Sequence, residues 1–149
     1  MTSTPGVKPP TSYRVTGTAQ AGGPARILAA DETIRLDAGW ATPPTGGPGP
    51  AELLAGAFAA CLLKNVARAG HLLNFTYLDA TVTVTARRQD SPPRFVEIGY
   101  DLQLTTDESE RRVELLHSNL RRYGTVYNTL AAVCDVHGTV TARRSAGPG

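Results

Sequence analysis

Cysteine and histidine are scarce in this sequence, with two cysteines and three histidines among 149 residues. Cys61 and Cys134 lie far apart in the chain, and no histidine stands close to Cys61. This pattern lacks the ligand spacing of zinc and related sites, so we expect no metal and no cofactor. Two cysteines, with no apolar leader segment at the N-terminus, are typical of reduced thiols, and we expect a cytoplasmic protein.

Charge of one sign and long apolar runs are also lacking. The formal net charge is only +2 and the arginines are scattered, which argues against a nucleic-acid-binding surface. The apolar stretch from Ala51 to Leu63 falls short of the roughly 20 residues that a membrane span needs. We therefore expect neither nucleic acid nor a membrane as a partner.

The sequence does contain clear strand and helix patterns. Alternating apolar residues predict strands over 13–20, 26–30, 34–36, 78–88, 96–104 and 134–142. Helices are predicted from Pro50 to Gly70, from the cap Asp107 to Gly124, and over about 125–132. This order indicates an α+β fold in which a curved antiparallel sheet surrounds central helices. We expect one domain over 12–144, with flexible tails at 1–11 and 145–149.

The helix that begins at Pro50 is apolar on every face, and Cys61 lies at its middle. Between Ala51 and Leu63 only Glu52 is polar. A helix of this kind belongs inside a fold, covered on all sides. Glu52 is placed to meet the positive end of the helix dipole, about half a turn of azimuth away from Cys61. We interpret it as a helix-start charge; the alternative is that it acts on the thiol.

The segment before this helix, Gly39 to Pro50, holds four prolines and four glycines. Proline and glycine at this density exclude a helix or a central strand. The segment is either a linker or a folded loop at the mouth of the Cys61 region, and we favour the folded loop. Trp40 then either lines a pocket there or fills the core or a subunit interface.

Two short motifs resemble the OsmC/Ohr family, which includes thiol-based organic hydroperoxide reductases of bacteria. The first is Pro50-Ala51-Glu52-Leu53-Leu54 followed by Ala59-Ala60-Cys61, and the second is Thr125-Val126-Tyr127-Asn128-Thr129-Leu130. The order of predicted elements matches the family over nearly the whole chain from Tyr13, as a divergent member. The resemblance implies an intertwined homodimer, with two apolar helices at its centre and a thiol site at the subunit interface.

In the peroxidases of that family, one cysteine attacks the peroxide and a second then forms a disulfide with it. An arginine and a glutamate hold the reactive thiolate. By position, Cys61 matches the first cysteine, whereas Gly124, Ala51 and Pro24 stand at the positions of the second cysteine, the glutamate and the arginine. Arg26 lies two residues beyond the arginine position and Glu52 one beyond the glutamate position, and both are kept as candidates.

Two functions follow from these residues. The first is a one-cysteine organic hydroperoxide reductase in oxidative stress defence, with Cys61 oxidised to a sulfenic acid and restored by an external thiol. Leu54, Phe58 and Trp40 would supply the apolar part of a substrate pocket that also includes Lys64. Either Lys64 or Arg68 would favour the thiolate. The second is a non-catalytic relative that binds a small apolar ligand at the dimer interface.

The remaining titratable residues have structural interpretations. Cys134 is in phase with the apolar residues of the last strand, which predicts a core position. His71, His117 and His137 are each predicted to be solvated, and none is placed like a general base.

Overall fold

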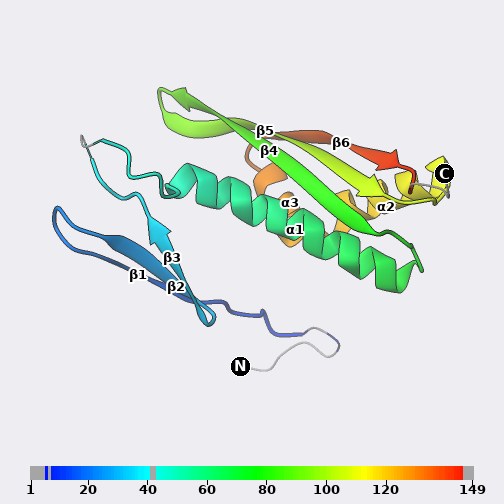
Figure 1. The fold of residues 1–149 in the computed structure, drawn as a ribbon, viewed down its shortest axis with the longest axis horizontal. Helices are drawn as coiled ribbons and strands as arrows, with labels where there is room; N and C mark the ends of the chain where they lie inside the picture. The colour runs from blue at the N-terminus through cyan, green and yellow to red at the C-terminus, as the bar shows by residue number, and fades with distance from the viewer. Residues whose placement is uncertain (1–5, 7, 41–42, 146–149) are drawn as a thin grey trace. The chain divides into compact units, whose positions relative to one another are not determined.

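The structure is a computed structural model that describes residues 6, 8–40 and 43–145. It divides into two compact units, Met1–Gly49 and Pro50–Gly149, and each is described here by itself (Figure 1). Most of the predicted tails, 1–11 and 145–149, lie outside the described residues. The prediction of a single domain therefore stays a prediction.

The first unit is a three-stranded antiparallel sheet. Its strands are β1 (Val15–Ala19), β2 (Ala25–Ala29) and β3 (Glu32–Leu36), in the order β1-β2-β3. A tight hairpin turn joins β1 to β2. The amide of Gln20 donates to the carbonyl of Pro24 at 3.1 Å, and Gly22 has a φ of 69°, which glycine adopts without strain.

The second unit packs three helices on one face of a second sheet. Its elements are α1 (Pro50–Leu72), β4 (Asp79–Asp90), β5 (Pro93–Thr105), α2 (Glu110–Tyr123), α3 (Thr125–Ala131) and β6 (Asp135–Arg143). The sheet order is β4-β5-β6, and Figure 1 shows all three helices on the same side of it. The α+β class is confirmed. One detail differs, because β6 pairs parallel to β5 after the two-helix crossover rather than antiparallel.

Apolar side chains from the three helices and from the inner face of the sheet form one core. Its buried members are Phe58, Leu62, Val66, Ala69, Phe75, Ile98, Tyr100, Leu102, Leu104, Val113, Leu116, Leu120, Tyr127 and Leu130. On β5 the alternation from Ile98 to Leu104 places every second residue in this core, as the sequence pattern predicts.

The N-terminal cap of α2 is not the predicted one. The side chain of Ser109 accepts the amide of Arg112 at 3.3 Å and caps the helix. Asp107 instead accepts hydrogen bonds from the amide and hydroxyl of Ser145 at the end of the described chain. The predicted C-cap at Gly124 is confirmed, since its amide donates to the carbonyl of Leu120 at 3.2 Å.

The helix α1 is covered on one side only within its unit. Phe58, Leu62, Val66 and Ala69 are buried, whereas a strip on the other side is exposed and contains Gly56, Ala57, Ala60, Leu63 and Ala67. The prediction of cover on all sides is therefore not met by this unit alone. The helix has 23 residues, so by length and composition it is long enough to cross a membrane, unlike the shorter run considered in the sequence. Core helices of soluble proteins often meet the same criterion.

Candidate functional site

The sulfur of Cys61 lies against the junction between α2 and α3. Cys61 is partly exposed and sits on the face of α1 that meets this junction. A Cβ atom placed on Gly124 would lie 3.3 Å from the Cys61 sulfur. Gly124 ends α2 and begins α3, because its amide bonds back to Leu120 and its carbonyl accepts the amide of Asn128 at 2.9 Å. Two residues far apart in the sequence are therefore in contact.

Position 124 is glycine because of space and not because of backbone conformation. Its φ of −72° suits any residue. A Cβ there would, however, come within 2.9 Å of the Tyr127 Cβ and 3.0 Å of the Leu120 carbonyl oxygen. Gly124 is buried, and its bare backbone lets the α2–α3 junction close directly onto the sulfur.

Asn65 is the polar neighbour of the thiol on α1 itself. Its side-chain amide donates to the Cys61 carbonyl at 2.8 Å and lies 3.6 Å from the Cys61 sulfur. Because Asn65 follows Cys61 by four residues, the two side chains share one face of the helix. An N–H group directed at a sulfur stabilises negative charge on it.

Two arginines, one on α1 and one on α2, lie against the ring of Tyr123. The guanidinium of Arg68 lies 4.7 Å from the centre of the Tyr123 ring, and that of Arg122 lies 5.3 Å from it. Arg68 also donates to the side-chain oxygen of Asn119 at 3.2 Å. The predicted Lys64 is exposed on the solvent side of α1.

The predicted apolar pocket is only partly assembled in this unit. Phe58 has no exposed surface and is packed between Tyr100 and Tyr127, with ring centres 5.7 Å away in each case. It is therefore a core residue in this unit and cannot line an open pocket there. Leu54 is half-buried and packs against the same core.

Glu52 is not brought to the thiol within the chain. It is exposed in the first turn of α1, nine residues before Cys61, which separates them by about 13 Å along the helix axis. This placement fits a helix-start charge, and any action on Cys61 remains a prediction.

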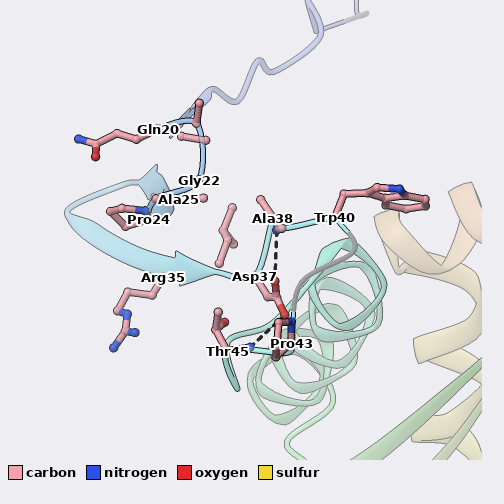
Figure 2. Close-up of a pocket in the computed structure, with 15 residues that line it drawn as sticks. Gln20, Gly22, Pro24, Ala25, Arg35, Asp37, Ala38, Trp40, Pro43 and Thr45 are labelled. Carbon is pink, nitrogen blue, oxygen red and sulfur yellow. Dashed lines mark hydrogen bonds between the residues drawn. The ribbon is translucent and has the colours of Figure 1, made fainter.

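Trp40 and Arg26 belong to the other unit, so their predicted place at the thiol remains a prediction. Arg26 is exposed on β2. Trp40 is 91% exposed and lines a pocket of about 720 Å³ (Figure 2). The hairpin turn between β1 and β2 and the loop that follows β3 form the rest of this pocket.

The described part of the loop from Gly39 to Pro50 is folded, as favoured from the sequence. The Asp37 carboxylate accepts the amides of Gly39 at 3.2 Å and Thr45 at 3.3 Å, and both bonds are drawn in Figure 2. The Asp37 amide donates to the carbonyl of Pro48 at 2.9 Å. These bonds rule out a structureless linker over the described residues.

Sequence reasoning missed a partly buried polar cluster formed by Tyr100, His117 and Tyr127. The Tyr100 hydroxyl lies 2.6 Å from Nε2 of His117, and the two rings meet edge to face. The prediction that His117 is solvated is wrong. It follows Val113 by four residues and precedes Leu120 by three, so the helical pattern already placed it on the apolar face. Burial raises the pKa of Tyr100, and the hydrogen bond with Tyr127 adds to this. Burial, with a smaller contribution from Arg121, lowers the pKa of His117.

The other titratable residues have local partners. Cys134 packs against the core as predicted, and its thiol donates to the Leu130 carbonyl at 3.3 Å. Burial, followed by the charge of Asp135, raises the pKa of this thiol. His137 is exposed, as predicted, but lies 2.9 Å from the Glu97 carboxylate. Hydrogen bonds from Arg87 and His137 lower the pKa of Glu97. Among the described residues, no group of three or more His, Cys, Asp or Glu side chains is placed to hold a metal.

Comparison with known proteins gives a consistent result. Residues 43–137 match the family model described as OsmC-like protein. No curated protein matches the sequence.

Several solved structures share the fold. The OsmC-like protein from Mycoplasma pneumoniae is 21% identical with a TM-score of 0.79, over 89% of this chain and 97% of that one. An organic hydroperoxide resistance protein from Elizabethkingia anophelis is 13% identical with a TM-score of 0.73, over 92% and 100% of the two chains. OhrB of Bacillus subtilis, an organic hydroperoxide resistance protein, is 18% identical with a TM-score of 0.61, over 88% and 98%. At these identities the likeness establishes the fold.

Proposed function

This chain belongs to the OsmC-like protein family, and from that premise we propose that it reduces organic hydroperoxides with a single cysteine, Cys61. Relatives of the same fold include proteins named for organic hydroperoxide resistance. A role in oxidative stress defence in the cytoplasm, where the thiol is kept reduced, fits this proposal.

The contact between Gly124 and the Cys61 sulfur carries the proposal. Position 124 matches the second cysteine of the peroxidases in the resemblance described above. A Cβ at this position would lie 3.3 Å from the sulfur, although the residue is glycine and the two positions are far apart in the chain. This closeness supports the assignment of Cys61 as the peroxide-reacting thiol.

The reaction requires one thiol and a peroxide. The Cys61 thiolate attacks the terminal oxygen of R–O–OH, the O–O bond breaks, and the leaving alkoxide takes up a proton to become R–OH. Cys61 is then a sulfenic acid. With Gly124 in place of a second cysteine, it must be reduced by a thiol from outside the chain.

Asn65 is the group best placed to assist this step within the chain. Its amide lies 3.6 Å from the sulfur and would stabilise the attacking thiolate. Ala51 and Pro24 stand at the family positions of the glutamate and the arginine. Arg26 or Glu52 would have to supply those roles from another position or another subunit.

We also propose that two chains form a homodimer through α1. The exposed strip on this helix contains small and apolar residues beside Lys64, and Gly56, Ala57 and Ala60 allow close approach of another backbone. Replacing Ala60 with arginine should shift the protein toward a monomer of 15.7 kDa in light scattering. Thr83→Arg, on the exposed face of β4, is the matched control and should leave the mass unchanged. A wild-type protein that is already a stable monomer would contradict the dimer.

The second candidate is a non-catalytic relative that binds a small apolar ligand at the dimer interface. The exposed strip of α1 favours it. So do Gly124, Ala51 and Pro24, which stand at the family positions of the second cysteine, the glutamate and the arginine. It predicts ligand binding without oxidation of Cys61.

Intact-mass spectrometry after one equivalent of cumene hydroperoxide separates the two candidates. The peroxidase predicts the gain of one oxygen at Cys61, capture by a sulfenate trap, and further oxidation to sulfinic acid in excess peroxide. Cys61→Ser should abolish turnover, whereas Cys134→Ser should leave it nearly intact. Cumene hydroperoxide should react faster than hydrogen peroxide. A wild-type protein that stays unmodified would rule out the peroxidase function and leave the ligand-binding function.

A further inference from the structure

Two guanidinium groups lie around Tyr123, the last residue of α2. Arg68 and Arg122 both lie over the Tyr123 ring, at 4.7 Å and 5.3 Å from its centre. Tyr123 directly precedes Gly124, whose backbone contacts the Cys61 sulfur. Among the described residues, the ion pairs involve neither arginine. This positive charge has no acidic side chain paired with it in the described part of the chain.

Three polar residues of α1 lie on one face of the helix. Cys61, Asn65 and Arg68 are spaced at i, i+4 and i+7, so they share one face of the helix. The rise of the helix separates the backbone positions of Cys61 and Arg68 by about 10 Å. The order along this face is a thiol, a side-chain amide and a guanidinium.

Arg68 is held in position and still has donors to offer. One of its nitrogens donates to Asn119 at 3.2 Å, and the flat group rests on Tyr123, which is 45% exposed. A guanidinium carries five N–H donors, and its fork matches a carboxylate. Arg122 adds a second positive charge on the same ring.

We propose that this face binds a small thiol that carries a carboxylate, and that this thiol reduces Cys61. The carboxylate pairs with Arg68 and Arg122, the body of the thiol lies along Asn65, and its sulfur meets Cys61. The role as reductant rests on the proposed peroxidase function, but the binding preference does not.

The reduction takes two equivalents of the thiol. The first thiolate attacks the sulfur of the Cys61 sulfenic acid, the S–O bond breaks, and the oxygen leaves as water after protonation. This gives a mixed disulfide between Cys61 and the small thiol. A second thiolate attacks the small thiol's sulfur in that disulfide and releases Cys61 as a thiolate, with the oxidised small disulfide as product.

The test measures thiol exchange at Cys61 without any peroxide. In a Cys134→Ser protein, 2,2′-dithiodipyridine converts Cys61 to a mixed disulfide with a neutral thiopyridyl group. The release of thiopyridone is then followed with glutathione and with its glycine ethyl ester, which has the same thiol but one carboxylate masked. We expect glutathione to react about tenfold faster, as befits one charge-assisted hydrogen-bonded contact, and added salt to reduce the difference.

Substitutions locate the preference on the molecule. Arg68→Gln should remove most of the difference between glutathione and its ester, and Arg68→Lys should retain part of it. Arg111→Gln is the control, because it removes the same charge from the exposed first turns of α2, about 15 Å along the helix from the Arg121–Arg122 end. It should leave the difference unchanged.

Three results would overturn the proposal. The first is equal rates for glutathione and its ester. The second is an equal loss of the rate difference in the Arg111→Gln and Arg68→Gln variants, which would indicate an effect of the protein's overall charge and not of a binding site. The third is a folded protein in which Cys61 forms no mixed disulfide, since no thiol then reaches it. If peroxide fails to oxidise Cys61 but the exchange preference is present, the peroxidase function fails and the thiol-binding face stands.

Discussion

Replacing Gly124 with cysteine should give this chain an internal disulfide at its thiol site. A Cβ at position 124 lies 3.3 Å from the Cys61 sulfur. In a disulfide, the Cβ of one cysteine lies about 3 Å from the sulfur of the other, given an S–S bond of about 2.05 Å. The two positions therefore need to shift by only a few tenths of an ångström to form the bond.

The crowding caused by this substitution destabilises both redox states, whereas the disulfide stabilises only the oxidised one. The new Cβ would also press against the Tyr127 Cβ at 2.9 Å and the Leu120 carbonyl oxygen at 3.0 Å. Crowding of this kind costs about 1–3 kcal/mol, so the reduced variant should be less stable than the wild type. Closing a loop of about 60 residues stabilises the oxidised form by about 4 kcal/mol in the chain-entropy model. The oxidised variant should then equal or exceed the wild type.

Denaturant unfolding with and without a reductant measures both effects. Gly124→Ser is the control, since it carries a similar volume with no thiol, and its stability should not respond to the reductant. After one equivalent of cumene hydroperoxide, the Gly124→Cys protein should lose two hydrogens and have no free thiol at positions 61 and 124. A folded variant that keeps both thiols after peroxide or another oxidant would refute the contact between Gly124 and Cys61, and with it the main support for the peroxidase.

Two further predictions concern residues away from the sulfur. Burial lowers the pKa of His117 below its ordinary value of about 6.5, so the unfolded chain binds a proton that the folded chain resists. The free energy of unfolding is therefore unaffected by His117 when the pH is above about 6.5, because the residue is neutral in both states. It falls as the pH drops below about 6.5, because only the unfolded chain then takes up the proton readily. His117→Gln should therefore flatten the fall in unfolding midpoint between about pH 8 and about pH 5, and a fall as steep as that of the wild type would contradict this account. Burial raises the pKa of Cys134, so its alkylation should be slower than that of an unfolded thiol and should accelerate only on unfolding. Equal rates in the folded and unfolded protein would show that Cys134 is not held in the core.

Patterns confined to one element predicted the fold well. Alternation in β5 and the apolar stripe of α2 identified the faces that build the core, because burial of a face depends on local periodicity. The same patterns say nothing about which strands pair. The parallel pairing of β6 with β5 follows from the crossover through α2 and α3, and neither this pairing nor the division into two three-stranded sheets is encoded by a single strand.

Errors arose where a side chain had two possible partners. Asp107 and Ser109 are both good helix caps, and the choice went to Ser109 because Asp107 bonds to Ser145, far away in the sequence. His117 was assigned to solvent by its polarity, although its position in the helix pattern placed it toward Tyr100. In both cases the tertiary partner, and not the local signal, decided the outcome.

The site itself depends on a contact that a sequence cannot display, because glycine at position 124 also has a sufficient local explanation as a helix cap. In the structure the same glycine is the backbone that contacts the Cys61 sulfur, in a space too small for a side chain without rearrangement. If the thiol reacts with peroxide, the glycine bears on the source of the electrons that restore it, because a disulfide between positions 61 and 124 is excluded. The reductant must then come from solution and be recognised beside Cys61. Arg68 and Arg122, with no acidic partner among the described residues, are the groups on that face whose charge would select it.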